Sequence, residues 1–135
     1  MIITASVKNT YQKNEVNLST DKNSKKLDVP GKVEGYGSSV NGGELLFLSL
    51  ATCFCNDIYR EAARRNMNIS SVEVTVSGEF GKEGEPGSNI VYEANVLSTG
   101  STQEEIAALI HHVDNIAEVH NTLRRGVDVS LKQME

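Results

Sequence analysis

The stretch "ELLFLSLATCFCNDIYREAARRN" (residues 44–66) determines the fold that we expect for this chain. It contains no proline or glycine, and a helix of this length spans about 34 Å. Its first half is apolar on nearly every face, which predicts a helix that is buried all round. Its second half places apolar residues on one face and charged residues elsewhere. The sequence therefore predicts one long central helix that begins near Gly43.

Short segments with strand-like patterns flank this helix on both sides. Interleaved polar and apolar residues predict strands at 2–7, 15–20, 25–29, 71–80, 90–97 and 126–131. A glycine-rich loop is expected at 30–43, and a capping box of Thr102 and Glu105 predicts the start of a second helix. Because strands and helices are segregated rather than alternating, we expect an α+β fold with a single domain over residues 1–135.

The first half of the central helix is apolar on more faces than one small sheet can cover. A second subunit would supply the missing cover. We therefore expect an obligate homodimer.

The bulk composition excludes several classes of partner. The net charge of −5 and an aromatic content of 5% argue against nucleic acid, which requires clustered Lys and Arg and often stacking rings. No apolar stretch approaches the roughly 20 residues that a membrane span needs. With two cysteines and no recognisable export signal, we expect a cytoplasmic protein with reduced thiols.

Cys53 and Cys55 are two residues apart on the expected helix, so their side chains point about 200° away from each other. This spacing argues against a disulfide and against a shared metal ion. The histidines His111, His112 and His120 do not supply a matching ligand spacing. We expect neither a metal ion nor a cofactor. Each thiol is either a space-filling core residue or a reactive nucleophile, and the residue pattern leaves both readings open.

Two motifs resemble those of the OsmC/Ohr superfamily, the osmotically inducible and organic-hydroperoxide-resistance proteins. "GGELLFLSLATC" (42–53) resembles the central-helix motif, in which an acidic residue leads to a cysteine. "AEVHNTLRRGVDV" (117–129) resembles the distal signature Cys-Pro-Val-His/Ser, followed by a leucine and a last strand. The resemblance covers essentially the whole chain. It implies antiparallel sheets wrapped around a long central helix in an intertwined homodimer.

The resemblance also implies a thiol peroxidase whose sites lie at the subunit interface. Cys53 would attack an organic hydroperoxide, and a distal cysteine would resolve the resulting sulfenic acid. The chain departs from this pattern at three points. Ala117 and Glu118 stand where the resolving cysteine and its proline are expected, no arginine precedes Arg60, and Gly43 rather than Glu44 occupies the expected place of the acidic residue. Glu44 would be an orienting carboxylate or simply an acidic residue at the helix start.

Two functional hypotheses follow. In the first, Cys53 reduces organic hydroperoxides in a one-cysteine mode, with an external thiol as reductant. In the second, the chain is a non-catalytic dimeric relative that binds a small apolar or oxidised molecule.

Four further residues are candidates at the site. Cys55 and Tyr36, the latter from the glycine-rich loop, are candidate pocket residues. His120 is expected just past the second helix, as part of the pocket or as a residue of the helix-terminal turn. Asp57 stands four residues after Cys53, so it either hydrogen-bonds the thiol or forms a surface pair with Arg60.

Overall fold

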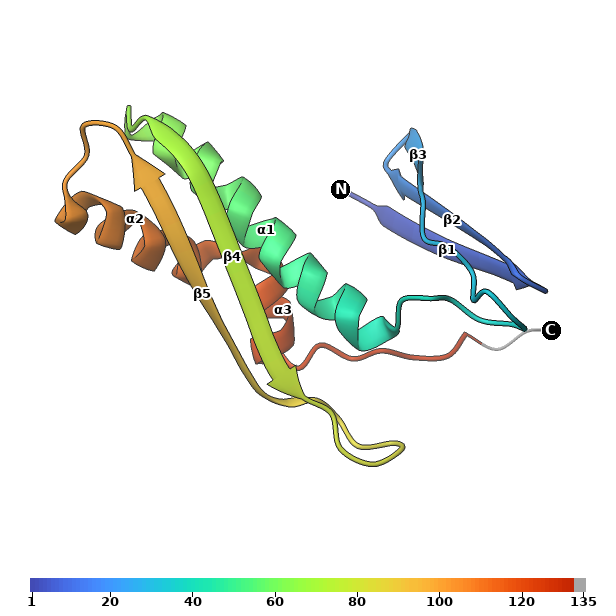
Figure 1. The fold of residues 1–135 in the computed structure, drawn as a ribbon. Coiled ribbons are helices and arrows are strands. Elements are labelled where there is room, and N and C mark those ends of the chain that lie inside the picture. The colour runs from blue at the N-terminus through green and yellow to red at the C-terminus, as the bar shows by residue number, and fades with distance from the viewer. Residues whose placement is uncertain (133–135) are drawn as a thin grey trace. The chain divides into compact units, whose positions relative to one another are not determined.

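The computed structural model describes residues 1–132, which divide into two compact units, Met1–Leu45 and the residues from Leu46 onward. The first unit is an antiparallel sheet of three strands in the order β1 (Ile3–Thr10), β2 (Lys13–Thr20) and β3 (Asn23–Leu27) (Figure 1). Two-residue turns join these strands, as expected for a meander. The expected glycine-rich loop follows, with one isolated bridge between Gly31 and Ser38. That the two units form a single domain remains a prediction.

The second unit packs helices against a β-hairpin. Helix α1 (Gly42–Arg64) begins in the first unit, and it is followed by β4 (Ile69–Glu79) and β5 (Ser88–Ser98), which pair with each other. Helices α2 (Gln103–Ile116) and α3 (Glu118–Arg125) complete the order of elements. The predicted α+β class, with antiparallel sheets and a long helix, is confirmed (Figure 1). None of the helices within residues 1–132 combines the length and apolar character that a membrane span requires.

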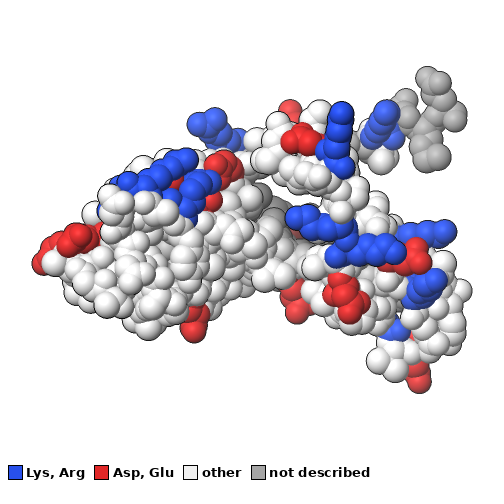
Figure 2. Space-filling model, turned by 90° about the horizontal axis from the view of Figure 1, so that it is seen from above, with Lys and Arg blue, Asp and Glu red and all other residues white. Residues whose placement is uncertain are grey.

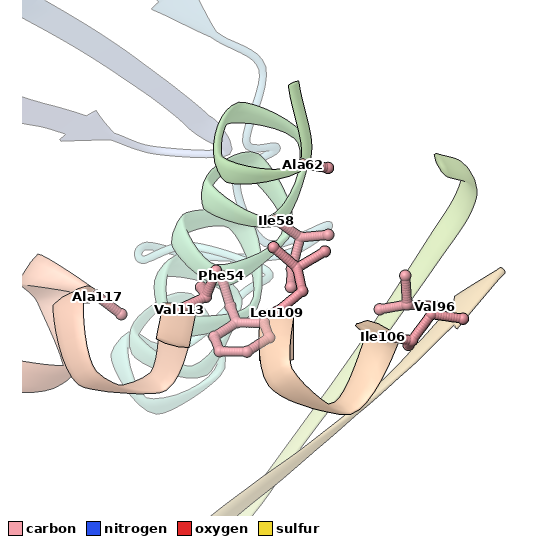
Figure 3. Packing of buried hydrophobic residues seen from close by; sticks show 8 residues of the cluster. All are labelled: Phe54, Ile58, Ala62, Val96, Ile106, Leu109, Val113 and Ala117. Atoms are coloured by element: carbon pink, nitrogen blue, oxygen red, sulfur yellow. The ribbon is translucent and has the colours of Figure 1, made fainter. Parts of the chain in front are cut away.

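One apolar core holds the second unit together. Figure 3 shows Phe54 and Ile58 of α1 facing Leu109 and Val113 of α2, while Val96 of β5 lies beside Ile106. Phe54, Ile58, Leu109 and Val113 are completely buried. Burial of side chains of this size stabilises a fold by about 1.5–3 kcal/mol each. The core therefore fixes α1 relative to α2 and the hairpin.

Capping interactions explain where the helices begin. The amide of Glu44 donates to Asn41 Oδ1 at 2.8 Å, and the amide of Asn41 donates to Glu44 Oε1 at 2.9 Å. This reciprocal pair is a capping box at the start of α1. The box predicted for Thr102 and Glu105 is present at the start of α2. Both predicted helix starts are therefore confirmed.

The helices of the single chain differ from the sequence expectation in their burial and in their number. The buried residues of α1 all lie along one face, and Leu48 is 57% exposed, so the helix is not buried all round. The hairpin and α2 can cover only one side of a helix this long. The second helix ends at Ile116, just before His120 as expected, but the extended Ala117 (φ −64°, ψ 111°) leads directly into a further helix, α3. His120 consequently lies inside a third helix and not in a turn.

The strand expected at 126–131 is absent from the described part of the chain. Helix α3 ends at Gly126 in the left-handed conformation (φ 61°), and residues 127–132 form no strand. The apolar positions Val127, Val129 and Leu131 are exposed. The alternating pattern favours a strand, but a strand also needs a neighbour for its backbone hydrogen bonds.

Candidate active site

Cys53 lies at the edge of the core on α1, half-buried, one helical turn before Asp57. Its thiol donates to Asp57 Oδ2 at 3.7 Å. Asp57 is only 5% exposed, and Arg60 Nη1 lies 3.0 Å from its other oxygen. Both interactions considered for Asp57 in the sequence are therefore present. The ion pair is not a surface pair, because the carboxylate is buried.

Helix α3 adds a second carboxylate to this site. One carboxylate oxygen of Glu118, one of Asp57 and the sulfur of Cys53 all lie within 4.8 Å of one another. Glu118 is the first residue of α3 and is exposed to solvent. The site thus consists of one thiol and two carboxylates, with Arg60 bound to the inner carboxylate.

The surroundings of Cys53 favour its neutral form. Burial raises the pKa of the Cys53 thiol, and the negative charges of Asp57 and Glu118 raise this pKa further. A backbone hydrogen bond with Val119 opposes the rise. The pKa of Asp57 is also raised, because burial and the neighbouring Glu118 outweigh the effect of Arg60. The result is a protonated thiol hydrogen-bonded to a carboxylate with increased proton affinity.

Cys53, Asp57 and Glu118 also form the group within residues 1–132 whose donor atoms are close enough to share a metal ion. A metal-bound cysteine must be a thiolate, and the raised thiol pKa works against that state. The Arg60 guanidinium on Asp57 would also repel a cation. These residues therefore fit a metal poorly, and the expectation of no metal remains a prediction.

Glu44 and Tyr36 belong to the first unit, whereas Cys53 belongs to the second. The carboxylate of Glu44 accepts the hydrogen bond of the α1 capping box. Tyr36 is 68% exposed and lies edge-on against Tyr11, with a centroid distance of 5.5 Å. The catalytic role of Glu44 and the pocket role of Tyr36 remain predictions.

Cys55 faces a different environment from Cys53. It lines a shallow depression between α1 and β4, together with Ala51, Thr52, Asn56, Val72, Glu73 and Val74. Both cysteines are free. This separation agrees with the opposite directions expected from their spacing on a helix. A role of Cys55 in a pocket remains a prediction.

His120 is buried in the core rather than placed at an open surface. It is 4% exposed, and its ring lies 4.6 Å from that of Tyr92 and 5.7 Å from that of Phe54. Neither ring nitrogen has a hydrogen-bond partner within the described residues. Its packing anchors α3, and α3 carries Glu118 and Val119 to Cys53. The pocket role of His120 remains a prediction.

An acid-dependent loss of stability is expected from His120. Burial and the nearby Arg124 of α3 lower its pKa below 6.5, while Asp114 of α2 opposes this. Tyr92 of β5 donates to Asp114 and adds no charge at these pH values. The unfolded state consequently binds more protons, so stability is complete above pH 6.5 and falls below it. The free energy of unfolding should change by at most about 1.4 kcal/mol per pH unit through this one group.

Urea denaturation between pH 7.5 and 5 measures this slope. His120→Phe removes the titrating group, so we expect its pH slope to be smaller than that of the wild type, whatever its overall stability. Replacement of the exposed His111 by glutamine serves as the matched control. Equal slopes for His120→Phe and the wild type would contradict the prediction.

The sequence did not predict several residues that lie close to the site or support α3. Glu118 was noted only as a departure from the distal motif, and that departure was the available signal for it. Arg124 Nη2 lies 2.6 Å from Asp114 Oδ1. Asp114 also accepts a hydrogen bond from Tyr92, which links β5, α2 and α3. These contacts join segments far apart in the sequence and leave no local pattern.

Comparison with known proteins places the chain in a family. The family model described as OsmC-like protein matches residues 35–132, which include both motifs. The comparison with curated protein sequences yields no significant match.

Solved structures share the fold at low sequence identity. An OsmC-like protein from Mycoplasma pneumoniae is 20% identical, with a TM-score of 0.60 over 90% of this chain and 87% of that one. An OsmC-like protein of unknown function from Vibrio cholerae is 14% identical, with a TM-score of 0.61 over 88% and 92%. An organic hydroperoxide resistance protein from Legionella pneumophila is 23% identical, with a TM-score of 0.55 over 93% and 92%. The resemblance inferred from the two motifs is confirmed, and the chain belongs to the OsmC-like protein family.

Proposed function

We propose that this protein reduces organic hydroperoxides through Cys53 in a one-cysteine cycle, with an external thiol as reductant. The hydrogen bond from Cys53 to Asp57 carries the proposal. A nucleophilic thiol with a raised pKa needs an adjacent base, and Asp57 provides one within reach. Structural neighbours described as hydroperoxide resistance proteins support the substrate class.

In the first step the sulfur of Cys53 attacks the outer oxygen of the hydroperoxide. The sulfur–oxygen bond forms as the oxygen–oxygen bond breaks, and the alkoxide leaves with a proton. The thiol proton passes to Asp57, which makes it available to the leaving alkoxide. Cys53 is oxidised to a sulfenic acid, and the hydroperoxide is reduced to an alcohol.

The second half of the cycle depends on thiols from outside the chain. One external thiol condenses with the sulfenic acid, releasing water and forming a mixed disulfide. A second external thiol attacks this disulfide, which regenerates Cys53 and releases the oxidised reductant. Ala117, at the expected resolving position, is fully buried and has no thiol. A reducing compartment such as the cytoplasm suits this cycle, because it supplies low-molecular-weight thiols.

The cycle is proposed to run in a homodimer. Leu48 of α1 is 57% exposed, and Val129 and Leu131 are almost completely exposed. A second copy of the chain would cover these apolar side chains and supply a strand partner for residues 127–131. Both features support the dimer expected from the sequence.

A second candidate function is supported by the raised pKa of Cys53. A thiol that stays protonated beside two carboxylates reacts slowly unless Asp57 removes its proton. If Asp57 does not do so, the protein is a dimeric binding protein for a small apolar or oxidised molecule. The two functions differ in whether Cys53 reacts at neutral pH.

Trapping of sulfenic acid separates these functions. The purified protein is treated with cumene hydroperoxide at pH 7 in the presence of a dimedone probe, and each cysteine peptide is measured by mass spectrometry. We expect rapid labelling of Cys53, complete loss of labelling in Cys53→Ser, and wild-type labelling in Cys55→Ser. Absence of labelling at pH 7, with labelling only where ordinary thiols ionise, would reject the peroxidase function.

A further inference from the structure

We infer that Glu118 determines the specificity of the Cys53 site and favours uncharged organic hydroperoxides over hydroperoxides with a carboxylate close to the peroxide group. This inference rests on the proposed function and names the substrate class of the same site. It follows from the charged groups around the Cys53 thiol. Asp57 forms an ion pair with Arg60, whereas Glu118 is exposed to solvent.

The two carboxylates of the site are paired differently. Asp57 is buried, and the Arg60 guanidinium lies 3.0 Å away. Glu118 is exposed, and its carboxylate makes no ion pair within 4.0 Å in the part of the chain that the structure describes. One carboxylate oxygen of Glu118 lies within 4.8 Å of the Cys53 sulfur. Glu118 also raises the pKa of Arg60, so this one cation faces two carboxylates and the site keeps a net negative charge, of which Glu118 is the solvent-exposed part.

The backbone of Glu118 is held firmly in this position. His120, two residues further along α3, packs against Phe54 and Tyr92. An acidic residue in the first turn of a helix also interacts favourably with the helix dipole, which explains the residue type without reference to a substrate. Only the effect on the thiol distinguishes a specificity role from this structural role.

Distant surface charges contribute little to the potential at Cys53. On the face shown in Figure 2, acidic side chains are intermingled with basic ones. Exposed charges further apart than about 8–10 Å are largely screened at physiological salt. The carboxylates nearest to Cys53 therefore set the local potential that an anionic substrate meets.

Coulomb's law gives the expected size of the effect. Two negative charges about 5 Å apart in a watery environment repel each other enough to slow a reaction roughly fourfold. Removal of the Glu118 charge should therefore accelerate anionic reagents about fourfold relative to uncharged ones. High salt should reduce this factor, because both charges are solvent-exposed.

Alkylation of Cys53 tests the charge effect without any peroxidase activity. Rates with iodoacetamide, which is neutral, and iodoacetate, which is anionic, are measured on the Cys53 peptide by mass spectrometry. Their ratio is independent of the thiolate fraction, because both reagents attack the same thiolate. We expect the iodoacetate-to-iodoacetamide ratio to rise about fourfold in Glu118→Gln. Glu104→Gln, which removes an exposed carboxylate from the first turn of α2, should leave the ratio unchanged.

A matched pair of hydroperoxides then tests the substrate class. tert-Butyl hydroperoxide and 2-hydroperoxy-2-methylpropanoate, whose carboxylate is on the carbon that bears the peroxide group, are compared by sulfenic-acid trapping at Cys53. The wild type should prefer the uncharged compound. An unchanged preference in Glu118→Gln, or an equal change in Glu104→Gln, would overturn the inference. If neither hydroperoxide reacts, the proposed function fails, and the alkylation ratio still decides whether Glu118 discriminates by charge.

Discussion

Replacement of Phe54 by alanine is expected to lower the free energy of unfolding by about 3–5 kcal/mol. Phe54 is completely buried and lies at the centre of the core formed by α1, α2 and the hairpin (Figure 3). Its ring packs edge-on against Tyr92, at a centroid distance of 4.9 Å, and also contacts His120. The substitution removes a large apolar side chain and both aromatic contacts, and the surrounding side chains cannot fill the cavity completely.

Urea denaturation followed by circular dichroism measures this loss at a fixed protein concentration, since dimerisation would add a concentration dependence. Phe54→Leu keeps most of the apolar volume and should cost much less than the alanine variant. Phe80→Ala removes the same side chain from a position that is 52% exposed, and it should also cost much less. A loss below about 1 kcal/mol for Phe54→Ala would contradict the central place of this residue in the core.

The same substitution should affect the site, because Phe54 is the residue next to Cys53 and supports His120 of α3. Loss of this support would loosen α3 and separate Glu118 and Val119 from the thiol. The packing of Phe54 should therefore influence the surroundings of Cys53 through the position of α3. The core also positions α3, whose Glu118 carboxylate lies within 4.8 Å of the Cys53 sulfur.

Much of the fold could be predicted because its signals are local. The absence of proline and glycine from 44–66 predicts α1, and the reciprocal side-chain pattern of Thr102 and Glu105 predicts the start of α2. Alternation of apolar residues at 71–80 predicts β4. Each of these signals lies within one element and reports its backbone conformation directly.

Other features could not be predicted because they depend on tertiary contacts. The break at Ala117 has no proline or glycine to mark it, and the extended backbone there places α3 against the core. The alternating residues at 126–131 favour an extended backbone, but a strand forms only where a neighbouring strand can pair with it. Position 53 was identified from the motif, whereas the meeting of Asp57 and Glu118 at its sulfur requires α1 and α3 to pack together.

Replacement of Asp57 by asparagine is expected to slow the reaction of Cys53 with cumene hydroperoxide at pH 7 by about 10- to 100-fold. General bases usually contribute about 10²–10⁴-fold, and the smaller estimate reflects a compensating effect. Removal of the Asp57 charge also removes one cause of the raised thiol pKa, so Cys53 ionises more easily in the variant. The variant loses its proton acceptor and gains some thiolate, and the first effect should be the larger.

The pH dependence distinguishes these two effects. In the wild type the rate should fall only below the raised pKa of Asp57 and change little above it until the thiol itself ionises. In Asp57→Asn the rate should rise about tenfold per pH unit up to the pKa of the thiol, because only free thiolate reacts. Stopped-flow measurement of hydroperoxide consumption from pH 5 to 10 gives both profiles, with Glu104→Gln as the carboxylate control. A faster reaction of Asp57→Asn at pH 7 would mean that Asp57 only suppresses the thiolate, and the protein would then keep Cys53 protonated as part of a binding site.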